Sequence, residues 1–226
     1  MMRKISIFLI CLLAVGMGSY GFAEIRGGSI EVSGYIGPLI GLDKAHFEGY
    51  PAGAELPEYG FVGIEEAGVD PNTGVFSGFR LGYNLTPYIG TEFSWGWSSA
   101  NYEVFEKFVT GEEEILGKTE IDTSQFLFHT NIILHLLPES RIVPFLTTGI
   151  GLIHFSDNAK VFFQKDDPGT QFVPNWGGGV KMFLTENIIL RGDLRFFNFA
   201  LGDNFKDRLT TLEVSGGLSY CFDLMK

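Results

Sequence analysis

Hydrophobic and polar residues alternate with a period of two along most of the chain after Gly27. No long stretch places its apolar residues 3.6 positions apart, so the pattern predicts strands and no long helix. Each alternating run is long enough to form one strand of a sheet. Eight strands are expected, at 28–42, 74–85, 88–100, 122–136, 142–156, 171–184, 187–200 and 209–222.

The connections between these predicted strands alternate in length. Tight turns are expected at 85–87, 137–141 and 185–187, and long loops at 43–73, 101–121, 157–170 and 201–208. Short turns at one end and long loops at the other are typical of up-and-down barrels in the bacterial outer membrane. An even number of strands places both ends of the barrel on the short-turn side, which faces the periplasm.

The N-terminal segment has the pattern of a secretory signal peptide. Arg3 and Lys4 precede an apolar run that begins at Ile5 and ends near Val15, and small residues follow it up to Ala23. The run is shorter than the about 20 residues that span a bilayer as a helix. We expect cleavage after Ala23, which divides the chain into a signal peptide at 1–23 and one barrel domain at 24–226; a buried N-terminal helix is the alternative.

The rest of the chain is apolar for an exported protein, yet it offers no membrane-spanning helix. It is rich in Gly and in aromatic residues and has a mean hydropathy of +0.16 over the full sequence, but Gly, Pro or a charge interrupts every later apolar stretch. Only helices and closed barrels satisfy their backbone hydrogen bonds inside lipid. The predicted fold is therefore all-β, an eight-stranded antiparallel up-and-down transmembrane β-barrel.

Within each strand, one parity is aliphatic and aromatic, and the other is small, polar or charged. A closed interior suits balanced charges, because an unpaired buried charge costs several kcal/mol, whereas Lys or Arg facing lipid costs about 2–4 kcal/mol. We therefore predict that the polar parity points inward; a soluble lipocalin-like carrier would turn its apolar face inward around a ligand. The polar parity collects four cations and four anions: Glu31, Arg80, Glu92, Lys181, Arg191, Asp193, Arg195 and Glu213.

The formal charge limits the partners. Removal of Arg3 and Lys4 leaves 14 basic against 27 acidic residues, a formal charge of −13, which argues against nucleic acid. The same cleavage removes Cys11 and leaves Cys221 as the single thiol, so no intramolecular disulfide is expected. The first two long loops are acidic, which leaves two interpretations open: solvated loops, or loops that bind divalent cations and lipopolysaccharide phosphates or a basic partner.

Aromatic residues fall where the two membrane interfaces are expected. Four lie toward the short-turn end and two toward the long-loop end: Tyr83, Tyr88, Tyr220 and Phe222, then Trp97 and Trp176.

The last strand resembles the C-terminal signal by which the barrel-assembly machinery recognises outer-membrane barrels. Ser215 is followed by Gly217, and Tyr220 and Phe222 come three and five residues after that glycine. Four further residues follow Phe222, where such chains usually end. The resemblance implies that this machinery is a partner during insertion.

Four further segments resemble the small outer-membrane β-barrel family that includes the OmpA-type and OmpX-type barrels. They are Phe79–Pro87, Val143–Gly151, Trp176–Val180 and Leu190–Phe197, and their order along the chain matches the order of the family's strands. The resemblance implies the fold and an outer-membrane location, with lipid and lipopolysaccharide as its surroundings. It implies little about activity.

A lipid A deacylase, which is also an eight-stranded barrel, is the enzymatic alternative. Such enzymes use a Ser activated by a nearby His, but this chain has Asn198 and Ala200 at the matching places. His154 and Ser156 form a weak second candidate pair, since residues two apart share a strand face.

Eight strands enclose an interior that side chains just fill, so a porin-like channel is not expected. Inward glycines leave a narrow ion leak as an open alternative. The expected function is that of a non-enzymatic integral outer-membrane protein with a structural role, with its acidic loops available for surface interactions. We expect no cofactor and no metal site.

Overall fold

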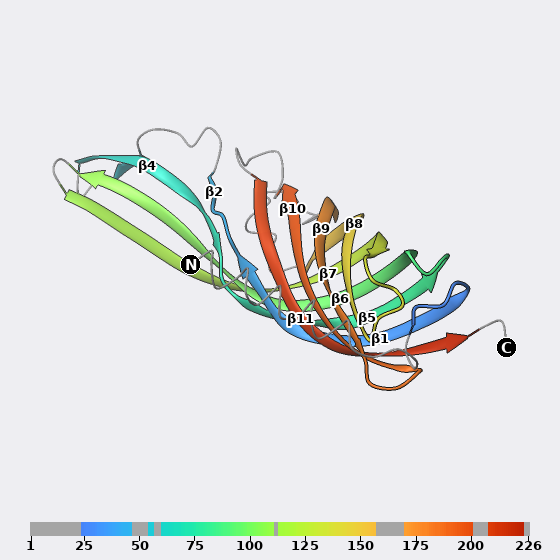
Figure 1. Cartoon of the computed structure of the whole chain (residues 1–226). Coiled ribbons are helices and arrows are strands. Elements are labelled where there is room, and N and C mark those ends of the chain that lie inside the picture. The colour runs from blue at the N-terminus through green and yellow to red at the C-terminus, as the bar shows by residue number, and fades with distance from the viewer. Residues whose placement is uncertain are drawn as a thin grey trace, which may run out of the picture.

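The computed structural model describes residues 24–46, 54–56, 60–110, 113–156, 170–200 and 208–223. Antiparallel strands make up almost all of this part of the chain (Figure 1). The strands are β1 (Ser29–Gly41), β2 (Ala45–His46), β3 (Ala54–Leu56), β4 (Gly60–Pro71), β5 (Gly74–Asn84), β6 (Ile89–Thr110), β7 (Glu113–His135), β8 (Ile142–Phe155), β9 (Thr170–Phe183), β10 (Ile188–Ala200) and β11 (Arg208–Asp223).

Eight of these strands close into a barrel. The pairing runs from β1 through β5, β6, β7, β8, β9 and β10 to β11, and β11 returns to β1. The closing pair is in register from Ser29↔Asp223 to Gly41↔Thr211, and β6 pairs with β7 from Ile89↔Leu134 outward. The predicted eight-stranded antiparallel up-and-down barrel is confirmed.

Six of the eight predicted strands agree with the structure to within two residues at each end. The exceptions are β6 and β7, which continue through the predicted loop at 101–121 and stay paired as far as Thr110↔Glu113. The predicted loop at 43–73 likewise contains β2, β3 and β4. These segments carry many charged residues. A hairpin outside the membrane has water beside it and tolerates charges on its strands.

This outer hairpin and β4 form a sheet that projects beyond the barrel (Figure 1). We call it the blade: β4 with its short partners β2 and β3, residues 100–110 of β6 and residues 113–123 of β7. The pairing of β4 with β6 lies in this outer part of β6, from Pro71↔Tyr102 to Gly63↔Val109. The blade stands at the end opposite the short turns, which is the extracellular end of an outer-membrane barrel.

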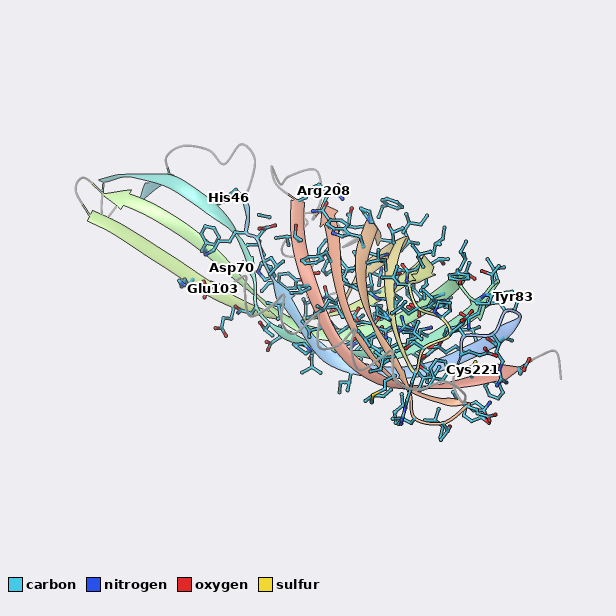
Figure 2. All side chains as sticks on the ribbon, viewed as in Figure 1. His46, Asp70, Tyr83, Glu103, Arg208 and Cys221 are labelled. Carbon is cyan, nitrogen blue, oxygen red and sulfur yellow. The ribbon has the colours of Figure 1, made fainter. Side chains whose placement is uncertain are left out.

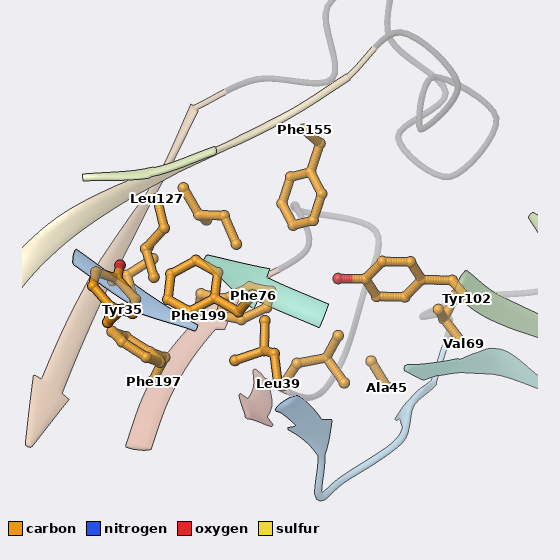
Figure 3. Close-up of a cluster of buried hydrophobic side chains, with 13 residues drawn as sticks. Tyr35, Leu39, Ala45, Val69, Phe76, Tyr102, Leu127, Phe155, Phe197 and Phe199 are labelled. Atoms are coloured by element: carbon orange, nitrogen blue, oxygen red, sulfur yellow. The ribbon is translucent and has the colours of Figure 1, made fainter. Parts of the chain in front are cut away.

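The interior contains three layers. Near the short turns lies a lower apolar layer of Ile25, Val143, Phe183 and Ile189, and charged residues follow above it. Toward the blade lies an upper apolar cluster, whose side chains converge from the barrel and from the blade (Figure 3). Its members are Tyr35, Leu39, Ala45, Val69, Phe76, Tyr102, Leu127, Ile153, Phe155, Val173, Phe197, Phe199 and Leu209.

The upper cluster corrects one sequence-based expectation. The charged residues of the inward parity are confined to the middle of the barrel; on β10 this parity continues from Arg195 to Phe197 and Phe199, which are 1 % exposed. A barrel that opens toward a folded blade has apolar partners available at that end, so inward aromatic residues are buried there instead of facing water.

The predicted signal peptide at 1–23 lies outside the described residues, as do most of the predicted loops at 157–170 and 201–208. Within the described part of the chain, no helix is long and apolar enough to cross a bilayer.

Candidate functional site in the barrel interior

The middle layer of the interior holds the charged residues that the sequence analysis grouped by parity. All eight lie inside the barrel, and none is more than 3 % exposed. Alternation along the strands produces this arrangement, since inward Arg191, Asp193 and Arg195 on β10 are separated by outward residues such as Leu194. We call this set the charged network: Glu31, Arg80, Glu92, Lys181, Arg191, Asp193, Arg195 and Glu213.

Asp193 accepts hydrogen bonds from three arginines, more than any other carboxylate of the network. Its Oδ1 accepts from the guanidinium groups of Arg191 and Arg195, both at 2.9 Å, and its Oδ2 accepts from Arg80, also at 2.9 Å. The two β10 arginines lie two residues to either side of Asp193, which puts all three side chains on one face of the strand. Arg80 reaches Asp193 from β5, so this contact crosses the lumen.

Two glutamates complete the centre of the network. Glu92 on β6 bonds Arg191 and, at 2.7 Å, Arg195. Glu213 on β11 accepts from Arg80 Nη2 at 2.6 Å. Every guanidinium at the centre therefore meets at least two carboxylates, an arrangement that offsets the cost of removing these charges from water.

A second group connects the centre to the short-turn end. Lys181 Nζ on β9 donates to Glu31 Oε2 on β1 at 2.5 Å. Arg191 Nη1 lies 3.5 Å from the other oxygen of Glu31, and Lys181 Nζ lies 3.3 Å from His135 Nε2. The network thus extends continuously from mid-barrel to just above the lower apolar layer.

Several buried polar residues beside the network were not among the predicted site residues. The Arg80 guanidinium lies 3.7 Å from the ring centroid of Tyr35, a cation–π contact, and His129 Nδ1 lies 2.8 Å from the side-chain amide of Asn131. His129, Asn131 and His135 are each at most 2 % exposed. They share the inward parity of β7, so parity applied to neutral polar residues as well as to charges would have found them.

The outward face of the barrel is apolar. Leu, Ile, Val and Phe side chains on all eight barrel strands are exposed there, with Ile36, Ile132 and Ile150 about 60 % exposed. The aromatic residues predicted for the interfaces, including Tyr83, Tyr220 and Trp176, also point outward. Figure 2 shows Tyr83 and Cys221 at one end of the barrel and Arg208 at the other.

The predicted insertion-signal residues occupy β11. Ser215 is buried and contacts Arg80 and Glu213, and a Cβ at Gly217 would lie 2.3 Å from the Gly34 carbonyl oxygen. Tyr220 and Phe222 are about half exposed, and their ring centroids lie 4.7 Å apart. Ser215 and Gly217 therefore lie on the inner side of β11, and Tyr220 and Phe222 face the membrane near the periplasmic interface.

The candidate pair His154 and Ser156 has separate hydrogen-bond partners. His154 is exposed, and its Nδ1 lies 3.3 Å from Thr170 Oγ1. Ser156 Oγ lies 3.1 Å from Thr123 Oγ1 and accepts from the Ser124 backbone N–H. Asp157, the carboxylate next to the pair, lies outside the described residues. In the part of the chain that is described, no group of three or more His, Cys, Asp and Glu side chains is arranged to hold a metal ion.

A closed barrel with an apolar outer belt and a charged, side-chain-filled interior defines an integral outer-membrane protein. The family comparison agrees: residues 13–222 match the model of the outer membrane protein beta-barrel domain. The chain belongs to this family and is located in the outer membrane, which rules out the soluble lipocalin-like carrier.

Solved structures with the same fold are distant in sequence. The outer membrane protein OprG of Pseudomonas aeruginosa is 13 % identical, with a TM-score of 0.56, and the match covers 89 % of this chain and 99 % of that one. Neisserial surface protein A is 16 % identical, with a TM-score of 0.52, and the match covers 86 % of this chain and 99 % of that one. The outer membrane protein AlkL is 18 % identical, with a TM-score of 0.51, and the match covers 92 % of this chain and 95 % of that one. These likenesses concern the fold alone, and no curated protein sequence matches the chain.

Proposed function

We propose that this protein is a non-enzymatic, non-conducting structural barrel that holds the blade on the outside of the outer membrane. The observation that carries the proposal is the filled interior. The charged network blocks the middle of the lumen, with four cations and four anions that pair across it. The lower apolar layer and the upper apolar cluster lie on either side of it.

The firm attachment of the blade supports a role at the cell surface. Ala45, Val69 and Tyr102 of the blade belong to the same upper cluster as Phe76 and Phe155 of the barrel. A side-chain hydrogen bond of 3.0 Å from Tyr102 Oη to Gln125 Oε1 adds to this contact. The blade is therefore a fixed extension of the barrel and suits the display of a surface.

Lipopolysaccharide is the partner that the surroundings favour for this surface. The outer segments at 43–73 and 101–121 carry many more acidic than basic residues, and divalent cations bridge such carboxylates to phosphates. The barrel-assembly machinery is the proposed partner during insertion, through Ser215, Gly217, Tyr220 and Phe222. Both partners belong to the proposal.

The enzymatic alternative receives no support from the geometry. A nucleophilic Ser needs its base within hydrogen-bond reach, but His154 and Ser156 bond Thr170 and Thr123 instead. Mass spectrometry of lipid A from cells with and without the protein tests this alternative. Cells that produce the Ser156→Ala variant are the control. If lipid A loses an acyl chain with the wild-type protein but not with this variant, the protein is an enzyme.

Planar-bilayer recordings on the purified protein test the main proposal. We expect no steady ohmic conductance above that of the bare bilayer, because ions meet three packed layers along the lumen. A reproducible conductance that scales with the amount of inserted protein would contradict the proposal. A porin inserted into the same bilayer is the positive control for the recording.

A further inference from the structure

The residues that precede β1 form a short segment across the short-turn end of the barrel. We call residues 24–28 the strap. The backbone turns away from the direction of β1 at Gly28, whose φ of 81° lies in the left-handed region that favours glycine. The Gly28 N–H donates to the Asn84 carbonyl oxygen at 2.6 Å, which ties this end of the strap to the last residue of β5.

The strap spans the whole mouth of the barrel. Ile25 N–H donates to the carbonyl oxygen of Pro138 at 2.9 Å, and Pro138 lies in the turn between β7 and β8. In the ring of eight strands, β7 and β8 stand opposite β1. A turn at residues 26–29, in which Ser29 Oγ donates to the Arg26 carbonyl oxygen at 2.6 Å, directs the chain from β1 across the mouth.

Ile25 plugs the mouth from below. Its side chain is 3 % exposed and packs with Val143, Phe183 and Ile189 from three different strands. Cys221 on β11 packs against the same layer and is only partly buried. Ile25 is the member of the lower apolar layer that comes from the strap, so this layer depends on the position of the strap.

Arg26 holds the strap in place through long ion pairs at the rim. Its guanidinium lies 3.3 Å from Asp223 and 3.9 Å from Glu186, at the end of β11 and in the turn between β9 and β10. The Arg26 and Glu186 side chains are 32 % and 52 % exposed. Pairs of this kind contribute little each, whereas the barrel strands are held by continuous ladders. The strap is held by single contacts and lacks such a ladder, so its release breaks fewer bonds than the separation of two barrel strands.

We propose that the strap is a releasable stopper that shields the polar short-turn end of the barrel interior from the periplasm. Arg26 is its latch and Ile25 its plug. The polar side chains above the plug are buried and hydrogen-bonded to one another: Asn84 Nδ2 donates to Ser29 Oγ at 2.9 Å, and Lys181 Nζ lies 3.3 Å from His135 Nε2. When the strap leaves, water and small polar solutes reach these side chains, while Asp193 and its three arginines stay enclosed.

Cys221 provides a built-in reporter for the stopper. The full-length gene is expressed in a Gram-negative host, and the outer-membrane protein is placed in lipid nanodiscs and treated with a sulfonated maleimide that does not cross lipid. We expect Arg26→Ala to raise the labelling rate of Cys221 about fivefold, the factor that corresponds to about 1 kcal/mol of lost latch contacts. Arg208→Ala, the same substitution at the opposite end, should label at the wild-type rate, and Cys221→Ser gives the background.

Heat-dependent gel mobility first shows that each variant is folded. A second measurement uses the unaltered chain: raising the salt concentration screens the rim pairs and should speed the labelling of the wild type but not that of Arg26→Ala. Equal labelling rates in the wild type and Arg26→Ala would overturn the proposal. If Arg26→Ala does not fold, a wild-type rate that is independent of salt overturns it and a rate that rises with salt supports it.

Discussion

At the scale of single residues, the interior depends on carboxylates that each pair with several arginines. Asp193 accepts from three arginines on two strands, and Glu92 from two. Removal of one such carboxylate leaves buried guanidinium groups without a counter-charge. That loss costs much more than the pair itself contributes to stability, because the remaining cations stay buried.

Asp193→Ala is therefore expected to lower the free energy of unfolding by about 3–5 kcal/mol. Urea titration of the protein in detergent or lipid, followed by heat-dependent gel mobility, measures the loss. The control is Glu103→Ala on the blade, whose partner Lys118 is half exposed; a surface pair of this kind changes stability by about 1 kcal/mol or less. Equal losses in the two variants would contradict the central role of Asp193.

Two glycines on neighbouring strands provide a second test at this scale. A Cβ on Gly179 would lie 2.1 Å from the Gly192 carbonyl oxygen and 2.6 Å from the Phe145 ring, whereas a Cβ on Gly192 would meet nothing within 4 Å. Gly179→Ala should destabilise the barrel by about 1–3 kcal/mol through overpacking, and Gly192→Ala should leave it unchanged or slightly more stable. The same urea titration distinguishes them, and a larger loss for Gly192→Ala would contradict the packing argument.

At the scale of elements, β6 and β7 combine two structures in one hairpin. Their inner halves belong to the barrel, and their outer halves form the blade with β4. The joint lies at the upper apolar cluster, where Tyr102 from the outer half of β6 packs with Phe155 from the barrel, their ring centroids 6.2 Å apart. The barrel halves keep complete ladders without the outer halves, so the barrel and the blade are separable elements.

Replacement of residues 102–121 by Asn-Gly should leave a folded barrel. The shortened hairpin closes on the Asn101–Asp122 pair with a two-residue turn that suits the twist of the strands. We expect insertion and heat-dependent mobility to be retained, with reduced stability because the upper cluster loses Tyr102. Tyr102→Phe isolates the hydrogen bond to Gln125 and should cost about 1 kcal/mol. Failure of the shortened protein to reach the outer membrane would show that the blade is required for barrel assembly.

At the scale of the whole molecule, opposite rules of burial apply on the two sides of one sheet. Charges are enclosed and paired, and large apolar side chains face lipid. The cost of a charge on the outer face depends on its depth in the membrane. This makes the membrane position of the barrel measurable by substitution.

Ile132→Arg is expected to cost about 2–4 kcal/mol, since Ile132 is 59 % exposed on the outer face of β7, in the part of the strand that belongs to the barrel. Leu137→Arg, in the short turn that follows β7, is the matched control and should cost about 1 kcal/mol or less at the interface. Folding into lipid vesicles at graded urea concentrations measures both. Similar costs at the two positions would contradict the proposed depth of the barrel in the membrane.

The sequence by itself determined the number of strands in the barrel, the short turns between them and the side of the sheet that faces inward. A period of two assigns every residue of a strand to one of two faces, and a balanced set of charges on one face identifies the interior. That reasoning located Asp193, Arg80 and their partners without coordinates. The same reasoning did not predict the blade. A strand in water carries charged residues just as a loop does, so Glu103 does not indicate whether the hairpin ends or continues.

Tertiary structure alone decided which inward residues meet. Parity placed Arg80 and Asp193 on the inward face, but their 2.9 Å contact depends on the order in which eight strands close. The same closure puts Pro138 opposite β1, within reach of Ile25, and brings Phe76, Phe155 and Phe199 into one cluster. Local alternation fixes the direction of a side chain, whereas ring closure fixes its partner, and partners far apart in sequence leave no periodic signal.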